Sequence, residues 1–291
     1  MNIRKAALGA ALASALSVPT LASAITVAGI HFQDGAIFET IDLFEAEAFG
    51  DGIGDDNGKI DQLGEKLVGI GQVNKIRAND IANGNPILWQ SGDNGMELTI
   101  YFYDYVAENF DPSGGADVKI GFTGGKVEIW AGAAGNFAPT TTQAGGIATA
   151  TNGVLWLSLQ GSPIGLEALG SSEYGSVSNT PITLRSVGPL ASGSVGGLGN
   201  LDVTGGLAAG HFDTNTFNCT PGLPGSPCPN SADKVFTSSG QLGANPNAAG
   251  WAFFGTGEVQ DFAIPEPGSL ALLGVSMAGL GFGARRKANK A

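Results

Sequence analysis

The sequence predicts an all-β body, an antiparallel β-sandwich or barrel, from its composition and from the pattern of its apolar segments. The chain has 291 residues, of which 43% are hydrophobic and 14% charged, and 47 are glycine. This apolar content is enough for a folded core, while the many glycines and few charges indicate short strands joined by turns. Between the two ends of the chain, no long segment has the 3.6-residue apolar period of a helix.

Nine segments of the body alternate in polarity or are rich in β-branched and aromatic residues, as strands are. They are residues 25–32, 38–48, 66–78, 97–107, 117–122, 126–132, 154–161, 181–187 and 257–264. Gly-Gly, Asn-Gly and Ser-Gly steps separate them. The body of about 240 residues fits one all-β domain or two small ones.

Three segments of the body are less simple. The clearest hairpin is predicted at DVKIGF-TGG-KVEIW (117–130), where a short glycine turn joins two strands. The glycine-rich segment 190–210 fits either a flat strand pair or a flexible loop. DLFEAEAFG (42–50) continues a strand or forms a short helix.

The N-terminus has the organisation of a secretory signal peptide. A basic start, MNIRK, precedes an apolar run, and Ala22 and Ala24 flank Ser23 in the small-x-small pattern that signal peptidase cuts. Residues 1–24 are therefore predicted to be removed on export, and the mature chain is expected to begin near Ile25.

The C-terminus carries a charge-free apolar run at residues 268–284, about 17 residues long. As a helix it would extend roughly 25 Å, the lower limit for crossing a bilayer. Arg285, Arg286 and Lys287 follow at once, and basic residues beside a span stay in the cytoplasm. The sequence predicts a single transmembrane helix with the body outside.

Pro265, Glu266 and Pro267, the apolar run and the Arg285-Arg286-Lys287 cluster together resemble the PEP-CTERM sorting tail of Gram-negative bacteria. The resemblance covers residues 264–291. It implies transient anchoring in the inner membrane, processing by an exosortase near Pro-Glu-Pro, and a final place at the cell surface or outside the cell. It also implies a host that makes extracellular polysaccharide and grows as biofilms or flocs.

The body is strongly acidic. Between residues 25 and 267 there are eight basic and all 26 acidic residues, a net charge of −18. Such a surface repels phosphate backbones and attracts divalent cations, so nucleic acid is excluded as a partner.

Cys219 and Cys228 lie in a proline- and glycine-rich loop, NCTPGLPGSPCPN. In an exported protein two cysteines at this spacing are predicted to form a disulfide. In the chain-entropy model, a disulfide that closes so small a loop would stabilise the folded protein by roughly 2–3 kcal/mol.

The acidic stretch DGIGDDNGKIDQLGE (51–65) is the one candidate for a cofactor, a calcium ion. Asp55, Asn57 and Asp61 are hard oxygen donors around Gly58. The stretch does not follow the EF-hand pattern, since the first and twelfth positions carry no side-chain oxygen. The alternative is an acidic turn, with Asn57-Gly58 reversing the chain before the next strand.

Catalytic patterns are sparse. The two histidines, His31 and His211, have no partner at metal-ligand spacing, and no G-x-S-x-G or P-loop motif occurs. A pair of carboxylates could still serve a glycoside hydrolase. The body is expected not to be an enzyme, with a secreted carbohydrate-active hydrolase as the alternative.

A candidate ligand surface lies on ELTIYFYDYVA (97–107). In a regular strand Tyr101, Tyr103 and Tyr105 share one face, opposite Ile100 and Phe102. If the aliphatic face points into the core, the tyrosines form an exposed ladder that could stack on sugar rings. We therefore expect a non-enzymatic surface or matrix protein associated with exopolysaccharide; a permanently tail-anchored surface protein is a further alternative.

Overall fold

The computed structural model describes residues 24–54, 56–114, 117–162, 182–187, 193–217, 232–242 and 250–265. The strands are β1 (Ala24–Val27), β2 (Ile30–Gln33), β3 (Gly35–Glu47), β4 (Lys66–Ala78), β5 (Ile87–Gln90), β6 (Met96–Gly114), β7 (Asp117–Ala133), β8 (Val154–Gly161), β9 (Ile182–Val187), β10 (Ser194–Gly205), β11 (Lys234–Leu242) and β12 (Phe253–Ala263). The helices are α2 (Gln143–Ala150) and α3 (Ala209–Phe212), with 3₁₀ turns η1 (Ile81–Asn83) and η2 (Asp93–Gly95).

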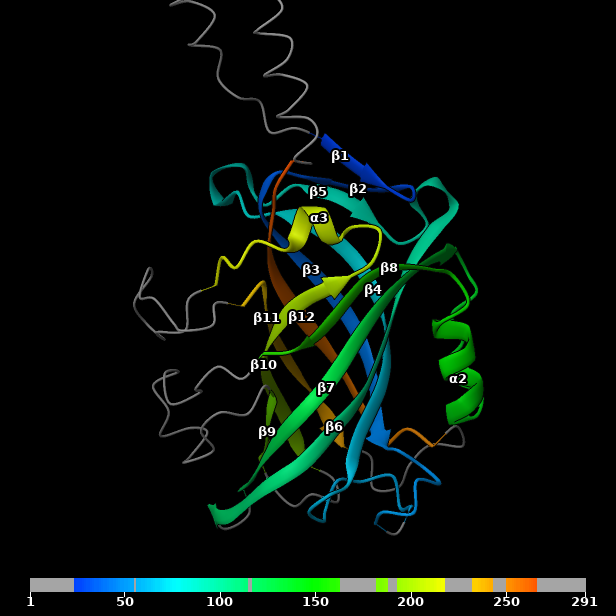
Figure 1. Ribbon diagram of the computed structural model, residues 1–291, viewed down its shortest axis with the longest axis vertical. Coiled ribbons are helices and arrows are strands. Elements are labelled where there is room, and N and C mark those ends of the chain that lie inside the picture. The colour runs from blue at the N-terminus through cyan, green and yellow to red at the C-terminus, as the bar shows by residue number, and fades with distance from the viewer. Residues whose placement is uncertain are drawn as a thin grey trace, which may run out of the picture.

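Eight of these strands close into an antiparallel barrel (Figure 1). The order around the barrel is β3, β4, β6, β7, β8, β10, β11 and β12, and β12 pairs with β3 to complete the circle. β9 lies between β7 and β10 beyond the end of β8. Closure leaves the eight barrel strands without a long free edge, which is how a sheet of this size avoids edge-to-edge pairing.

The alternation of the sequence decides which side chains enter the barrel. Along β3, Ile37, Ile41 and Leu43 point inward at every second position and are at most 2% exposed. Glu39 and Glu45 occupy the same inward register, and both are buried. The interior is therefore an apolar core that also contains carboxylates.

One end of the barrel is closed by aromatic packing. β1 and β2 form a hairpin whose turn uses Ala28 and Gly29, both at positive φ. Phe32 of this hairpin packs against Trp156 of β8 and Phe212 of α3, with ring centroids 6.0 Å and 5.0 Å away. This end, at the top of Figure 1, is called the α3 end below.

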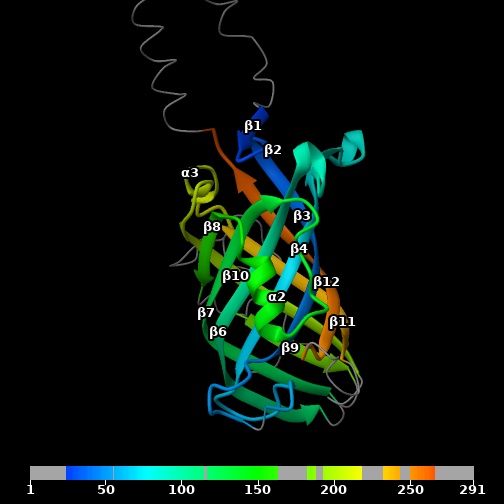
Figure 2. The same ribbon diagram turned by 90° about the vertical axis from the view of Figure 1, so that its right-hand side faces the viewer.

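Helix α2 covers part of the outer surface, over β4 and β6 (Figure 2). Thr142 caps its N-terminus by accepting a hydrogen bond from the Gly145 amide at 3.0 Å. Thr99 of β6 donates a 2.6 Å hydrogen bond to the carbonyl of Ala150. The helix buries Ile70 on the outer face of β4, so this stretch of β4 is covered on both sides.

The prediction of a β-rich body is confirmed, and of the two architectures the structure has the barrel. The predicted hairpin at 117–130 is wrong, because β7 runs unbroken from Asp117 to Ala133. Gly124 and Gly125 have φ of 70° and 89° and bend the strand opposite Asp104 of β6 without reversing it. The strand predicted at 25–32 is instead the β1–β2 hairpin, while β10 forms one strand within 190–210 and 42–47 belong to β3.

Within the described part of the chain, no helix is long and apolar enough to cross a membrane. The predicted transmembrane segment at 268–284 lies outside the described residues, as do residues 1–23 of the signal peptide predicted at 1–24.

Candidate functional site

The described chain ends at the start of the predicted sorting tail. β12 ends at Ala263, which pairs with Gly35 at the α3 end of the barrel. The amide of Ile264 donates to the carbonyl of His211 at 2.9 Å, and Nδ1 of His211 lies 2.9 Å from the carbonyl oxygen of Ile264. The barrel thus holds both backbone groups of the residue that precedes Pro265.

Of the predicted sorting residues, only Pro265 is described. Glu266, Pro267, Arg285, Arg286 and Lys287 lie outside the described residues, as does Ala22 of the signal cleavage pattern. Ala24 is the first residue of β1 and is exposed, whereas Ile25 is buried against the hairpin partner.

The predicted tyrosine ladder is only partly right. Tyr101 and Tyr103 lie on the outer face of β6, half-buried, with their rings stacked at 4.7 Å and an interplanar angle of 17°. Tyr105 was expected on the same face, and this expectation is wrong, because it lies inside the barrel and is 0% exposed.

A β-bulge in β6 explains the inward position of Tyr105. Leu67 pairs with Tyr105 and Gly69 with Phe102, so two residues of β6 face one residue of β4. Asp104 adopts φ 58°, in the left-handed region. One extra residue in a strand shifts the alternation of everything after it. Gly125 of β7 makes room, since a Cβ there would collide with the Tyr105 ring.

Charged side chains surround the outer tyrosines. The Tyr103 hydroxyl donates to Oε1 of Glu128 at 3.1 Å, and Nζ of Lys126 lies 5.9 Å from the Tyr103 ring centroid. Desolvation and this hydrogen bond raise the pKa of Tyr103 to about 12, and desolvation also raises the pKa of Tyr101. Both phenols therefore stay neutral at physiological pH and can donate hydrogen bonds.

The acidic loop between β3 and β4 folds largely as a turn. Asn57 donates to Asp61 at 3.0 Å, and the Asn57 side-chain oxygen accepts from the Lys59 amide at 2.7 Å. Gly58 has φ 81°, as a chain reversal requires. Asp55 lies outside the described residues.

Two carboxylates that sequence reasoning missed flank this loop. Glu47 accepts from the Gly58 amide at 3.1 Å, and Glu65 accepts from Asp61 and Gln62. A Cβ added at Gly54 would collide with Oε1 of both glutamates, so these two oxygens lie close together. Among the described residues, no group of three or more His, Cys, Asp or Glu could hold a metal ion. Calcium binding stays a prediction.

The remaining sequence candidates are a histidine and the two cysteines. His31 lies in β2 with its ring nitrogens 2.7 Å from the Thr26 hydroxyl and 2.8 Å from the Asn94 amide nitrogen. Cys219 and Cys228 lie outside the described residues, so their disulfide also stays a prediction.

The barrel interior contains polar groups that the sequence analysis did not select. Lys234 of β11 pairs with Glu39 at 3.2 Å and with Asp261 at 2.5 Å, and the three side chains are at most 1% exposed. Burial by itself lowers the pKa of Lys234, but the charges of Asp261 and Glu39 outweigh it and the pKa is raised. Burial raises the pKa of Asp261 well above its usual value, which Lys234 opposes only in part.

Nearer the other end of β3, Glu45 is also inside the barrel and 4% exposed. Burial raises its pKa to about 8. A charged residue at a regularly alternating apolar position was the signal that could have identified Glu39 and Glu45 from the sequence.

The comparisons with known proteins identify one region of the chain. The model of the PEP-CTERM protein-sorting motif matches residues 263–287. No curated protein matches the chain. The matched region begins where β12 leaves the barrel and continues through the apolar run into the basic cluster.

This motif implies processing by an exosortase and export through the membrane to the surface of a Gram-negative cell. The chain therefore carries a PEP-CTERM sorting motif and is an exosortase-sorted extracellular surface protein.

Proposed function

We propose that the barrel is a non-enzymatic component of the cell surface or extracellular matrix, where it associates with exopolysaccharide in biofilms or flocs. The observation that supports this proposal is the outer Tyr101–Tyr103 pair, with a hydrogen-bonding carboxylate and an ammonium group beside it. A sugar ring has an apolar face of C–H groups and a rim of hydroxyl groups. Aromatic rings contact the apolar face, and nearby polar side chains form hydrogen bonds with the hydroxyl groups.

The binding test uses exopolysaccharide prepared from the cells that make the protein. We expect the protein to sediment with the polymer, and the double variant Tyr101→Ser/Tyr103→Ser to bind roughly tenfold more weakly. Ile81→Ser is the control, since Ile81 is 83% exposed on a different part of the surface. Equal binding by the wild type and the double variant would show that the tyrosine pair is not the contact.

A secreted hydrolase is the alternative function. It can be tested on the same surface, which has two carboxylates near the tyrosine pair. Asp104 and Glu128 both act on the pKa of the outer tyrosines, so they lie near the proposed sugar contact. Release of soluble oligosaccharide by the wild type, lost in Asp104→Asn/Glu128→Gln, would replace the binding proposal with catalysis. Asparagine is chosen at 104 because it tolerates positive φ.

The sorting steps are tested by the intact mass and the location of the protein in its own cells. Signal peptidase and exosortase together predict an extracellular chain that begins near Ile25 and ends close to Pro265-Glu266-Pro267. A membrane-bound product that still carries Arg285, Arg286 and Lys287 would instead support a permanent tail anchor.

Calcium is proposed as a ligand of the acidic loop, supported by two carboxylate oxygens, Oε1 of Glu47 and of Glu65, that lie close together where the loop amides of Gly58 and Asp61 bind the other oxygens of the same groups. Oxygen-rich loops of this kind suit Ca²⁺ better than Mg²⁺. Thermal unfolding with calcium, with magnesium and with a chelator tests this; we expect calcium alone to raise the midpoint, and less so in Asp61→Asn. Identical midpoints in all three would exclude the site.

A further inference from the structure

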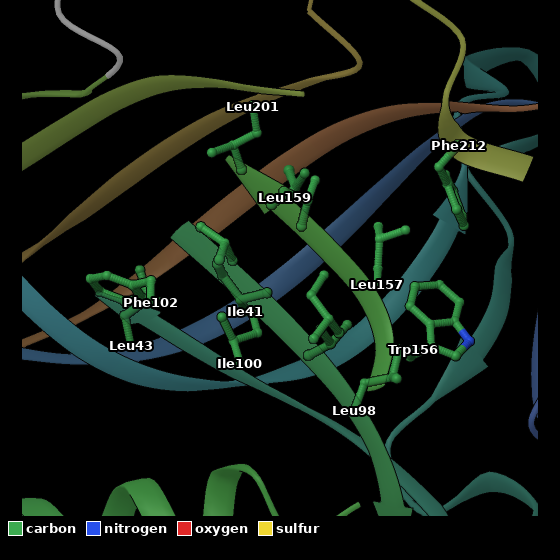
Figure 3. Close-up of a cluster of buried hydrophobic side chains, with 14 of the residues drawn as sticks. Ile41, Leu43, Leu98, Ile100, Phe102, Trp156, Leu157, Leu159, Leu201 and Phe212 are labelled. Carbon is green, nitrogen blue, oxygen red and sulfur yellow. The ribbon is translucent and has the colours of Figure 1, made fainter. Parts of the chain in front are cut away.

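The interior of the barrel contains a cavity of about 50 Å³. Most of its lining is aliphatic or aromatic, and Figure 3 shows several of these side chains directed at one another between the strands. They include Ile41, Leu43, Ile100, Phe102, Leu159 and Leu201. The cavity is separate from the outer tyrosine pair and from the acidic loop.

Two polar side chains that line the cavity have no hydrogen-bond partner within the described part of the chain. The Tyr105 hydroxyl is fully buried and unpaired. Glu45 is 4% exposed, and no described residue forms a hydrogen bond with its carboxyl group. A buried polar group without a partner costs about 1–3 kcal/mol, so native structures almost always provide one.

The strand register places these two groups near one another, two residues apart along β4. Glu45 of β3 pairs with Gly69 of β4, and Tyr105 of β6 pairs with Leu67, two residues away on the same strand. Both belong to the half of the barrel farther from α3. Both side chains line the same cavity.

We propose that this half of the barrel interior binds a compact, uncharged, mostly apolar molecule, with Glu45 and Tyr105 hydrogen-bonding its single hydroxyl or carbonyl group.

The charges of the interior favour an uncharged ligand. Three carboxyl groups, on Glu39, Glu45 and Asp261, share the interior with Lys234, which is already paired. An anion such as a carboxylate would lose its hydration in this apolar cavity, where Lys234 is already occupied by Glu39 and Asp261. A cation would require Glu45 to ionise in apolar surroundings, and the raised pKa of Glu45 opposes this.

The volume limits the size of the ligand. A single water needs roughly 10–15 Å³ of such space, so the cavity takes about three to five waters, or a molecule of at most about five non-hydrogen atoms. A branched C4 alcohol is near this limit. The lining favours it over water because an apolar wall gives water few hydrogen bonds.

The experiment is a titration of the full chain, with labelled isoleucine and leucine methyl groups, followed by NMR. Three probes share one carbon skeleton and differ in charge: isobutanol, isobutyrate and isobutylammonium. We expect saturable shifts at Ile41, Leu67 and Ile100 with isobutanol alone. Shifts at Ile147, which lies in α2 outside the barrel, a linear response without saturation, or equal binding of isobutyrate would each overturn the proposal.

Paired tyrosine variants supply the control. Tyr105→Phe removes the interior hydroxyl and is expected to weaken isobutanol binding by roughly fivefold to tenfold, the effect of one buried hydrogen bond. Tyr103→Phe removes the same group on the outer face and should leave binding unchanged. Glu45→Leu should weaken binding and Glu45→Gln should retain most of it. Equal effects of the two tyrosine variants would rule the site out.

Discussion

Glu39 and Glu45 lie six residues apart on β3, point into the same barrel and are both almost fully buried. Glu39 forms an ion pair with Lys234, beside Asp261. Glu45 has no such partner among the described residues, and burial raises its pKa to about 8. The barrel interior therefore holds one carboxyl group in an ion pair and another with no cation among its described neighbours, where burial raises the pKa.

The two positions should therefore respond differently to the same kind of change. Around Glu39, removing a partner leaves a buried charge and is costly. At Glu45, the carboxyl group lowers the free energy of unfolding only above pH 4.5, where it ionises in the unfolded state but keeps its proton in the folded state. Replacing it with glutamine removes this effect.

The largest expected effect is at Lys234. Lys234→Met would leave Glu39 and Asp261 buried without their cation, and we expect it to lower the free energy of unfolding by about 3–5 kcal/mol. Denaturant unfolding at pH 7 measures this. Lys126→Met, on the outer face beside Tyr103, is the control and should cost less than about 1 kcal/mol. Similar losses in both variants would contradict the importance of the buried pair.

The second prediction concerns the pH dependence of stability. The folded-state pKa of Glu45, about 8, is above its usual value of 4.5, so the folded state holds the proton over this interval. Stability contributed by this group is complete below pH 4.5 and falls as the pH rises toward 8. Relative to Glu45→Gln, the wild type should lose about 4 kcal/mol over this interval, since each unit of pKa shift corresponds to about 1.4 kcal/mol.

Unfolding of both proteins at pH 4, 6 and 8 measures that difference and cancels the contribution of Asp261, whose pKa is raised in both. Tyr105 shares the cavity with Glu45, and Glu39 and Lys234 line its other side. A difference that stays constant with pH would show that Glu45 ionises normally.

The third prediction tests the bulge that turns Tyr105 into the barrel. Asp104→Val places a β-branched residue at φ 58° and should cost about 1–2 kcal/mol. Asp104→Gly should be neutral or slightly stabilising by the same argument. If valine and glycine behave alike in thermal unfolding, the left-handed conformation at this position is not required.

The smallest effects are expected for two substitutions that each remove one tyrosine hydroxyl. One hydroxyl has no hydrogen bond to a described residue, and the other has one. Tyr105→Phe removes a buried hydroxyl without a hydrogen bond and should change stability by at most about 1 kcal/mol, in the stabilising direction. Tyr103→Phe loses the hydrogen bond to Glu128 and should destabilise by at most about 1 kcal/mol. The same sign for both would contradict the assignment of partners.

Much of the fold could be predicted from the sequence because alternation is a local property. The segments that became β3, β4, β6, β8 and β12 were identified, since each carries inward apolar residues at every second position. β11 was not identified: KVFTSSGQL has one strongly apolar pair and gains its place by pairing with β10 and β12.

The errors come from effects that pass between strands. Thr123-Gly124-Gly125 looks like a turn in isolation, yet opposite Asp104 it becomes a bend within one strand. The same irregularity moves Tyr105 to the inside, which no period-2 pattern could predict. The buried ion pair between Lys234 and Glu39 could not be predicted either, because its partners are 195 positions apart and meet only when the barrel closes.

The C-terminal signal was predictable for the opposite reason. Its information lies in the order of a tripeptide, an apolar run and a basic cluster, and it needs no tertiary contact to be recognised. The clamp by His211 on Ile264 could not be predicted, because it joins α3 to the end of β12 across 53 residues.

That clamp has a consequence for how the protein is oriented at its destination. The described chain starts at Ala24 and ends at Pro265, both at the α3 end of the barrel (Figure 1). A tether attached beyond Pro265 would hold this end toward the cell. The loop at residues 48–65 would then face outward, roughly 30 Å from the attachment point for tilted strands of this length. Among the described residues, the acidic loop rather than the α3 end would then face a neighbouring cell or polymer.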